Sequence, residues 1–442
     1  MNGKIIASAI ILIFTLLSGV FFCSKTPHYA ISRFVHPDTC GGCHTAIFSQ
    51  WKNSMHNLSL DDIIFRSISL NDLKNITDRE EIIEAEHCMK CHTPLGYISG
   101  NPKKTSDDIV KIPEIAKQGI QCDFCHSVSG SYSNYNAEYR LKPGNGESDP
   151  GTKRGPREDA KSDFHKTAYS SFHTRSDVCG TCHNVKHLVF GTLLDTTFNE
   201  WKKSPYNSAD PDKRLTCQDC HMRQRPGIPS TGSSARVKNP GKASDDGPQR
   251  DHVYTHYFSS VNSVIPSTKG DIVRQKLTEE TLKNSARIEI KGVTGKKLLV
   301  SVINTGAGHC IPTGVSHLRE VWLEITILDA AGRELFSSGR IDHEGNLDKN
   351  AVRYTTVFGD GKGMPVGSLS KAREILKDRR LVPLKETVES FNLSGIGDKE
   401  ITVTARLNYR IMSQSLADRL LGKGKMKIPL QVMAEDRKTI KL

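Results

Sequence analysis

The chain has 442 residues, which is enough for two or three domains and excludes a single small domain. Hydrophobic residues make up 36% of the sequence and charged residues 25%, so the chain is neither a polytopic membrane protein nor a wholly disordered one. Its formal net charge of +12 is typical of proteins that bind nucleic acids or anionic surfaces. No nucleic-acid-binding motif accompanies this charge, and we therefore expect no nucleic-acid partner.

A short basic segment and then an apolar segment open the chain. Residues 5–22 are an apolar run of 18 residues, which is longer than the apolar part of most signal peptides and reaches the length of a membrane span. Residues 1–26 are therefore predicted to be a signal peptide or a membrane anchor. Cys23, at the end of the run, leaves lipid attachment open. Each alternative exports the rest of the chain, which predicts a periplasmic or cell-envelope location.

Ten of the twelve cysteines lie in five copies of one pattern, in which two cysteines are separated by two residues and followed directly by histidine. Such a box is the attachment signal of haem c: the two thiols form thioethers to the porphyrin, and the histidine binds the iron. Zinc sites and disulfides also use paired cysteines, but neither explains the histidine after every second cysteine. The sequence thus predicts five covalent haem c groups. Boxes one to five are Cys40-Gly-Gly-Cys43-His44, Cys88-Met-Lys-Cys91-His92, Cys122-Asp-Phe-Cys125-His126, Cys179-Gly-Thr-Cys182-His183 and Cys217-Gln-Asp-Cys220-His221.

The boxes all lie in residues 27–225, where Gly, Asn, Ser and Pro are frequent and long periodic runs are few. We expect short helices and loops around the haem groups here, with little regular core. Residues 226–250 have the composition of a linker. Residues 226–285 as a whole are predicted to be a linker and bridging segment, with a helix over 271–284.

Residues 286–442 contain no box and change to a strand pattern. Apolar residues alternate with period two in several segments, as in Val321, Leu323, Ile325 and Ile327. About seven short strands in this length predict a β-sandwich. The predicted fold class is therefore α+β, with a mostly helical and loop-rich pentahaem domain followed by a β-sandwich domain.

A second axial histidine on each iron would give low-spin haem groups suited to carrying electrons. Twelve histidines lie outside the boxes, which is more than the five required. His165, His173 and His187 compete for the middle haem groups, and at most two or three of the candidates near the boxes need be ligands. The loop over 304–314 contains three glycines and Pro312, so its histidine is either an incidental part of a tight turn or a ligand held toward the haem domain. The predicted distal ligands are His56, His165, His173, His256 and His309.

Four longer patterns surround the boxes and the histidine of the loop over 304–314. They are box one followed by Gln50-Trp51-x-x-Ser54-x-His56, then Gly119-Ile-Gln before box three, Glu200-Trp201-x-x-Ser204-Pro205-Tyr206 before box five, and Gly308-His309-x-Ile-Pro312-Thr-Gly314. These patterns resemble the multihaem c-type cytochromes of the cytochrome c-552/4 type. The resemblance implies that His56, His165, His256 and His309 are distal ligands, whereas His173 and His187 match less well. That family includes electron carriers as well as oxidoreductases that act on small nitrogen compounds.

Five boxes and a surplus of histidine favour an exported electron-transfer protein with mainly bis-histidine haem groups and no catalytic residue of its own. Its expected partners are redox proteins, either other cytochromes or a quinone-linked donor, with membrane attachment through the N-terminus if the first segment is retained. The alternative is a multihaem oxidoreductase, in which one haem has an open axial position and acts on a small nitrogen or sulfur compound.

Overall fold

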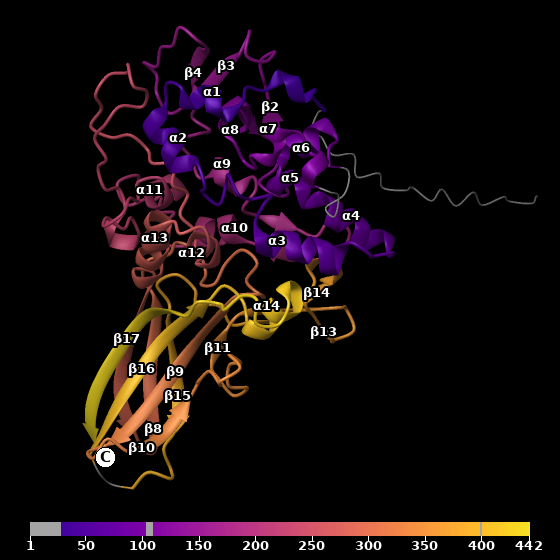
Figure 1. Ribbon diagram of the computed structural model, residues 1–442. Helices are drawn as coiled ribbons and strands as arrows, with labels where there is room; N and C mark the ends of the chain where they lie inside the picture. Colours follow the sequence, from indigo (N-terminus) through magenta and orange to yellow (C-terminus); the bar gives the residue numbers. More distant parts are fainter. Residues whose placement is uncertain (1–27, 103–108, 398–399) are drawn as a thin grey trace, which may run out of the picture.

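The computed structural model describes residues 28–102, 109–397 and 400–442. Figure 1 shows a cluster of short helices formed by the first half of the chain, and below it an elongated sheet structure formed by the last third. This arrangement confirms the α+β fold class. The predicted signal peptide or anchor lies outside the described residues. Within the described ranges, no helix is both long enough and apolar enough to cross a bilayer.

The helices of the first part are short because caps and turn residues interrupt them. In α6 (Pro94–Ser99), the Thr93 side chain accepts a hydrogen bond from the Gly96 N–H, and Gly100 ends the helix with φ of +74°. The other helices and helical turns are η1 (Ile31–Arg33), α1 (Pro37–Gly41), α2 (Thr45–Trp51), α3 (Ile63–Ile68), η2 (Ser69–Leu73), α4 (Arg79–His87), α5 (Met89–His92), η3 (Ile109–Lys111), α7 (Glu114–Lys117), α8 (Cys122–Ser127), α9 (Asp177–Gly180), α10 (Thr197–Lys203) and α11 (Cys217–His221).

Regular sheet is scarce in this part, and its apolar core is built around the boxes. The buried cluster contains Leu95, Phe124 and Tyr139, and the box cysteines Cys91 and Cys125 pack against it. A bound porphyrin would therefore adjoin this core. The strands form three two-stranded ladders, β1 (Val128–Ser131) with β2 (Tyr139–Leu141), β3 (Thr152–Gly155) with β4 (Lys166–Tyr169), and β5 (Val185–Lys186) with β6 (Leu193–Asp195).

The segment over 226–250, whose composition predicts a linker, packs against box one instead of hanging free. The Asp245 N–H donates to the Cys43 carbonyl at 2.8 Å, and the Ser230 side chain is fully buried. Its glycines and prolines allow the backbone to follow an irregular course. The one helical turn in this segment is η4 (Gly232–Ser234). Two helices follow, α12 (Val264–Thr268) and α13 (Ile272–Lys283), and α13 agrees with the predicted helix.

The described residues of the last part form three antiparallel sheets, and the buried faces of two of them share one core. The predicted alternation is observed, because Val321, Leu323, Ile325 and Ile327 are all fully buried on one face. One sheet has the order β15–β8–β7, from β7 (Ala286–Thr294), β8 (Lys297–Asn304) and β15 (Glu386–Asn392). The other has the order β10–β9–β16–β17, from β9 (Glu320–Asp329), β10 (Glu334–Ser338), β16 (Glu400–Arg410) and β17 (Gln431–Lys441), with β11 (Arg353–Tyr354) also paired to β9.

Smaller elements at one end of the sheets contact the helical part. The buried Ile64 of α3 belongs to the core cluster of the two sheets, and Arg419 forms a two-pronged ion pair with Asp72 at 2.6 and 3.1 Å. The sheet part is thus fastened to the helical part by side chains as well as by the chain itself. These smaller elements are β12 (Thr356–Gly359), β13 (Pro365–Val366), η5 (Leu369–Lys371), β14 (Glu374–Asp378) and α14 (Gln414–Leu421).

Candidate haem-binding centres

Each box folds around a single helical turn, which places two cysteines and a histidine on the same side. The histidine N–H donates to the carbonyl of the first cysteine at 3.0 Å in box one, 3.1 Å in box two and 2.9 Å in box four. All cysteines of the described residues are free. The ten box thiols are therefore available for thioether bonds, as the haem c prediction requires.

Cysteines of different boxes lie close to one another. The side chains of three pairs are near enough to interact electrostatically, namely Cys40 with Cys122, Cys91 with Cys182, and Cys179 with Cys217. Cys125 of box three also lies close enough to Cys179 of box four for their charges to interact. The attachment points therefore form one connected series, with boxes one, three, four and five in a row and box two attached to box four.

Three box histidines face a histidine from outside the boxes at nearly the same spacing. Two imidazoles on opposite sides of one metal ion need about 6.3 Å between their ring centres, from two bonds of about 2.0–2.1 Å and roughly 1.1 Å within each ring. The observed pairs therefore fit an iron between their rings. They are His44 with His165 at 6.4 Å, His56 with His183 at 6.2 Å, and His221 with His309 at 6.4 Å.

Backbone carbonyls hold the box histidines by the ring nitrogen that would not bind iron. In boxes one, two and three, the Nδ1–H donates to a carbonyl oxygen at 2.6 Å. A bond of this kind fixes the tautomer and the ring orientation of a metal-binding histidine, and it leaves Nε2 for the metal. The carbonyls belong to Ala243, Ser59 and Arg154.

The same arrangement recurs at three of the histidines predicted as distal ligands. His165, His256 and His309 each donate from Nδ1 to a carbonyl of their own segment, at 3.0–3.1 Å. Short loops that satisfy Nδ1 locally can present Nε2 outward. These three histidines therefore have the orientation that a ligand needs.

Two histidines compete for the iron of box three. The His173 ring centre lies 5.9 Å from that of His126, but its Nε2 is 3.0 Å from the Cys125 carbonyl and its Nδ1 is 2.9 Å from the Ser170 hydroxyl. Both of its ring nitrogens therefore already have partners in this structure. His256 interacts electrostatically with His126, and its Nε2 forms no hydrogen bond among the described residues.

His92 of box two has no histidine opposite it among the described residues. Its ring instead stacks on Phe65, with 3.6 Å between ring centres and 8° between the planes. A phenyl ring offers no atom that can bind iron. Box two therefore differs from the other four in its surroundings.

Burial keeps the candidate ligands in the neutral form that binds metal. Desolvation lowers the pKa of His56 to about 3 and those of His221 and His256 to about 4, and neighbouring histidines add to these shifts. Only an unprotonated imidazole nitrogen can coordinate iron. The electrostatics of the site thus agree with the ligand geometry.

His187 connects the helical and sheet parts and is not oriented as a ligand. Its Nε2 donates to the Ser370 carbonyl at 3.1 Å, and its Nδ1 accepts from the Val189 and Phe190 N–H groups. The buried carboxylate of Glu84 lies 3.5 Å from the same Nδ1. Both ring nitrogens of His187 therefore have hydrogen-bond partners, and the side chain stabilises the loop after box four.

Substituting Glu84 by glutamine is expected to remove a pH dependence of stability. Burial raises the pKa of Glu84 to about 7, whereas an unfolded glutamate titrates near about 4.3. Between these values the folded protein binds a proton that the unfolded chain does not, so the free energy of unfolding falls as pH rises through this window. E84Q should unfold at a higher temperature than the wild type at pH 8 and at a similar temperature at pH 4. The matched control is E81Q on the same helix, and equal behaviour of the two variants would contradict the prediction.

Several residues of the centres carried no recognisable sequence signal. The backbone carbonyls of Ala243, Ser59 and Arg154 can belong to any residue type, so only the fold identifies them. Charged residues between the cysteines of the boxes, by contrast, are visible in the sequence. Two of them are buried and paired, Lys90 with Glu138 and Asp123 with Lys153.

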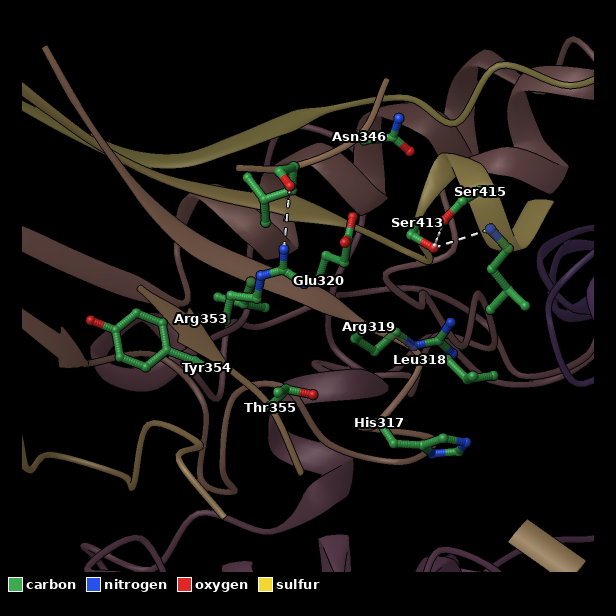
Figure 2. Close-up of a pocket in the computed structure, with 13 residues that line it drawn as sticks. His317, Leu318, Arg319, Glu320, Asn346, Arg353, Tyr354, Thr355, Ser413 and Ser415 are labelled. Atoms are coloured by element: carbon green, nitrogen blue, oxygen red, sulfur yellow. Dashed lines mark hydrogen bonds between the residues drawn. The ribbon is translucent and has the colours of Figure 1, made fainter. Parts of the chain in front are cut away.

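A separate cavity of about 300 Å³ lies in the sheet part, away from the boxes (Figure 2). The labelled side chains in Figure 2 include His317, Arg319, Arg353 and Ser413, and no box residue lines the cavity. This cavity is therefore not one of the predicted haem sites.

Comparisons with known proteins agree with the boxes. Residues 39–127, which contain boxes one to three, match the family model described as cytochrome c554 and c-prime. No curated protein matches the chain. The solved structure of a penta-heme cytochrome c552 from Thermochromatium tepidum is similar, with 19% identity, a TM-score of 0.62, and coverage of 93% of this chain and 100% of that chain.

The family match over residues 39–127 and the five boxes support a multihaem c-type cytochrome with covalently bound haem c. The structural likeness shows the fold, and at 93% coverage it extends into the sheet part. Electron transfer through haem and redox partners in general follow from this class.

Proposed function

We propose that the chain is an exported pentahaem electron-transfer protein. The observation that carries this proposal is the proximity of cysteines from different boxes, because their electrostatic interactions connect all five attachment points in one series. Haem iron supplies the one-electron carrier. The chain contributes the attachment, the spacing and the exclusion of water that such carriers require.

Four of the five irons have a second histidine as their distal axial ligand in this proposal. His165, His56 and His309 complete boxes one, four and five, as the ring spacings of 6.2–6.4 Å support. His256 completes box three, because both nitrogens of its competitor His173 are engaged elsewhere. His173 is then a partly buried structural histidine that hydrogen-bonds to the Cys125 carbonyl.

Box one is the proposed contact point for a redox partner. Cys43 is exposed, whereas the other box cysteines are at most partly exposed. An attachment site at the surface is where a second redox protein can approach closely. The partner class is another cytochrome or a quinone-linked donor, and membrane attachment through residues 1–26 would place the protein close to such a donor.

A second candidate function rests on box two. The absence of a histidine opposite His92 among the described residues leaves that iron open in our assignment. An open axial position admits a small ligand, so a multihaem oxidoreductase acting on a nitrogen or sulfur compound is the alternative.

Electron paramagnetic resonance of the purified ferric protein separates these functions. We expect four low-spin signals and one high-spin signal. If nitrite, hydroxylamine or sulfite leaves the high-spin signal unchanged, the carrier alone is supported. If one of these compounds converts it and is turned over by the reduced protein, the oxidoreductase is supported.

A further inference from the structure

The peptide unit after His309 is held from both sides. Its carbonyl, on His309, accepts from the Asn304 side chain at 2.7 Å, and its N–H, on Cys310, donates to the Glu200 carboxylate at 2.9 Å. Asn304 ends β8 in the sheet part, whereas Glu200 lies on α10 in the helical part. The backbone that carries His309 is therefore fixed jointly by the two parts of the molecule.

Glu200 is a buried charge with a full set of partners. Its carboxylate also accepts from the hydroxyls of Thr196 at 2.6 Å and Thr313 at 3.0 Å, and it forms an ion pair with Arg380. Only 8% of the Glu200 side chain and 11% of the Arg380 side chain are exposed. Charge-assisted bonds of this kind, shielded from water, are stronger than neutral ones. The carboxylate thus connects α10, the His309 loop and the segment around Arg380.

The two aromatic residues that follow Glu200 in the chain complete this surface. A Cβ atom at Gly308 would lie 3.1 Å from the Trp201 ring and 3.4 Å from the Tyr206 Cβ, so glycine lets the loop approach both. The Tyr206 hydroxyl donates to the Thr305 carbonyl at 2.7 Å. The pattern Glu200-Trp201-x-x-Ser204-Pro205-Tyr206 therefore forms one face that receives the loop over 304–314.

We propose that Glu200 is the positioning residue that holds His309 opposite His221, with Trp201 and Tyr206 forming the rest of the receiving face. The inference rests on the proposed role of His309 as an axial ligand. Glu200 does not touch iron in this account. It acts through the Cys310 N–H and the Thr313 hydroxyl, which fix the backbone on both sides of residues 311–312.

The reason for a charged residue at this position is the cost of leaving its partners unpaired. Without the carboxylate, the Cys310 N–H would lose its buried acceptor, and the Arg380 guanidinium would keep only its ion pair with Asp378. Loop conformations in which water supplies the lost hydrogen bonds would then become more stable. His309 would therefore dissociate from its iron more often. A surface ion pair has no such effect, because water replaces its partner.

The test is the rate at which carbon monoxide replaces His309 on the reduced, fully haem-loaded protein, followed by stopped-flow spectroscopy. In the wild type, this step waits for His309 to dissociate. E200Q should bind carbon monoxide about tenfold faster at one haem, because one charge-assisted bond is lost. T313V, which removes a single hydroxyl from the same carboxylate, should change the rate in the same direction by about threefold. The matched control is E334Q, which removes an exposed carboxylate paired with Arg340 and should leave the rate unchanged.

H309A separates failure of this inference from failure of the proposed function. If H309A gains no additional haem that binds carbon monoxide, His309 is not a ligand and the axial assignment is wrong. If H309A gains one and both E200Q and T313V keep the wild-type rate, the axial assignment stands and the positioning role of Glu200 is overturned. Should E200Q not fold, T313V alone decides between these outcomes.

Discussion

Replacing His309 by alanine is expected to convert one of the five irons from low-spin to high-spin while every thioether stays in place. The His309 ring lies 6.4 Å from that of His221, and the loop that carries it is tied to the helical part by Glu200 and Tyr206. Alanine leaves no atom that can reach the iron. We therefore expect a new high-spin signal that integrates to one haem, and a more positive potential at that haem because a nitrogen ligand is lost.

The control for this experiment is H343A, which removes an exposed histidine of the same sheet part. It should leave the spectrum as in the wild type. An H309A spectrum and set of potentials equal to those of H343A would mean that His309 is an incidental residue of a tight turn. His173 would then have to be reconsidered as a ligand, despite its two hydrogen bonds.

The double substitution C122S/C125S is expected to destabilise the helical part as a unit. Cys122 interacts electrostatically with Cys40 of box one, and Cys125 packs against the buried cluster that contains Phe124 and Tyr139. Losing the third haem would therefore remove a shared wall of the core. We expect the free energy of unfolding to fall by more than about 3 kcal/mol, which is the cost of creating a large cavity in a core.

Thermal unfolding followed by Soret absorbance and by circular dichroism measures this effect. C310S is the matched control, because Cys310 is buried but lies outside the boxes. It should change the free energy of unfolding by no more than about 1 kcal/mol. If the double variant retains four haem groups and unfolds at the wild-type temperature, the boxes do not share a core.

Local patterns predicted the parts of this molecule that depend on local geometry. A box needs only one helical turn, and the strands of the sheets need only alternation, so the five boxes and the buried face from Val321 to Ile327 could be predicted from the sequence. The helix over 271–284 was also predictable, because the Asp271 side chain caps its first turn.

Contacts between distant segments could not be predicted in this way. The Nδ1 of His44 bonds to Ala243, which lies 199 residues further along the chain, and any residue type can supply that carbonyl. For the same reason the segment over 226–250 was predicted as a linker although it packs on box one. The spacing of His173 made it a candidate ligand, but its bond to the Cys125 carbonyl depends on a fold that spacing does not encode.

The central claim is that five haem groups are covalently attached to this chain, and the intact mass of the denatured protein tests it most directly. The protein should be produced in a host that attaches haem to Cys-x-x-Cys-His boxes. Denaturation breaks axial bonds but leaves thioethers intact, so every attached haem adds its mass. The account predicts a mass increase of five haem groups, and C122S/C125S should show four. A wild-type mass with four or fewer would contradict the claim that all five boxes are haem sites.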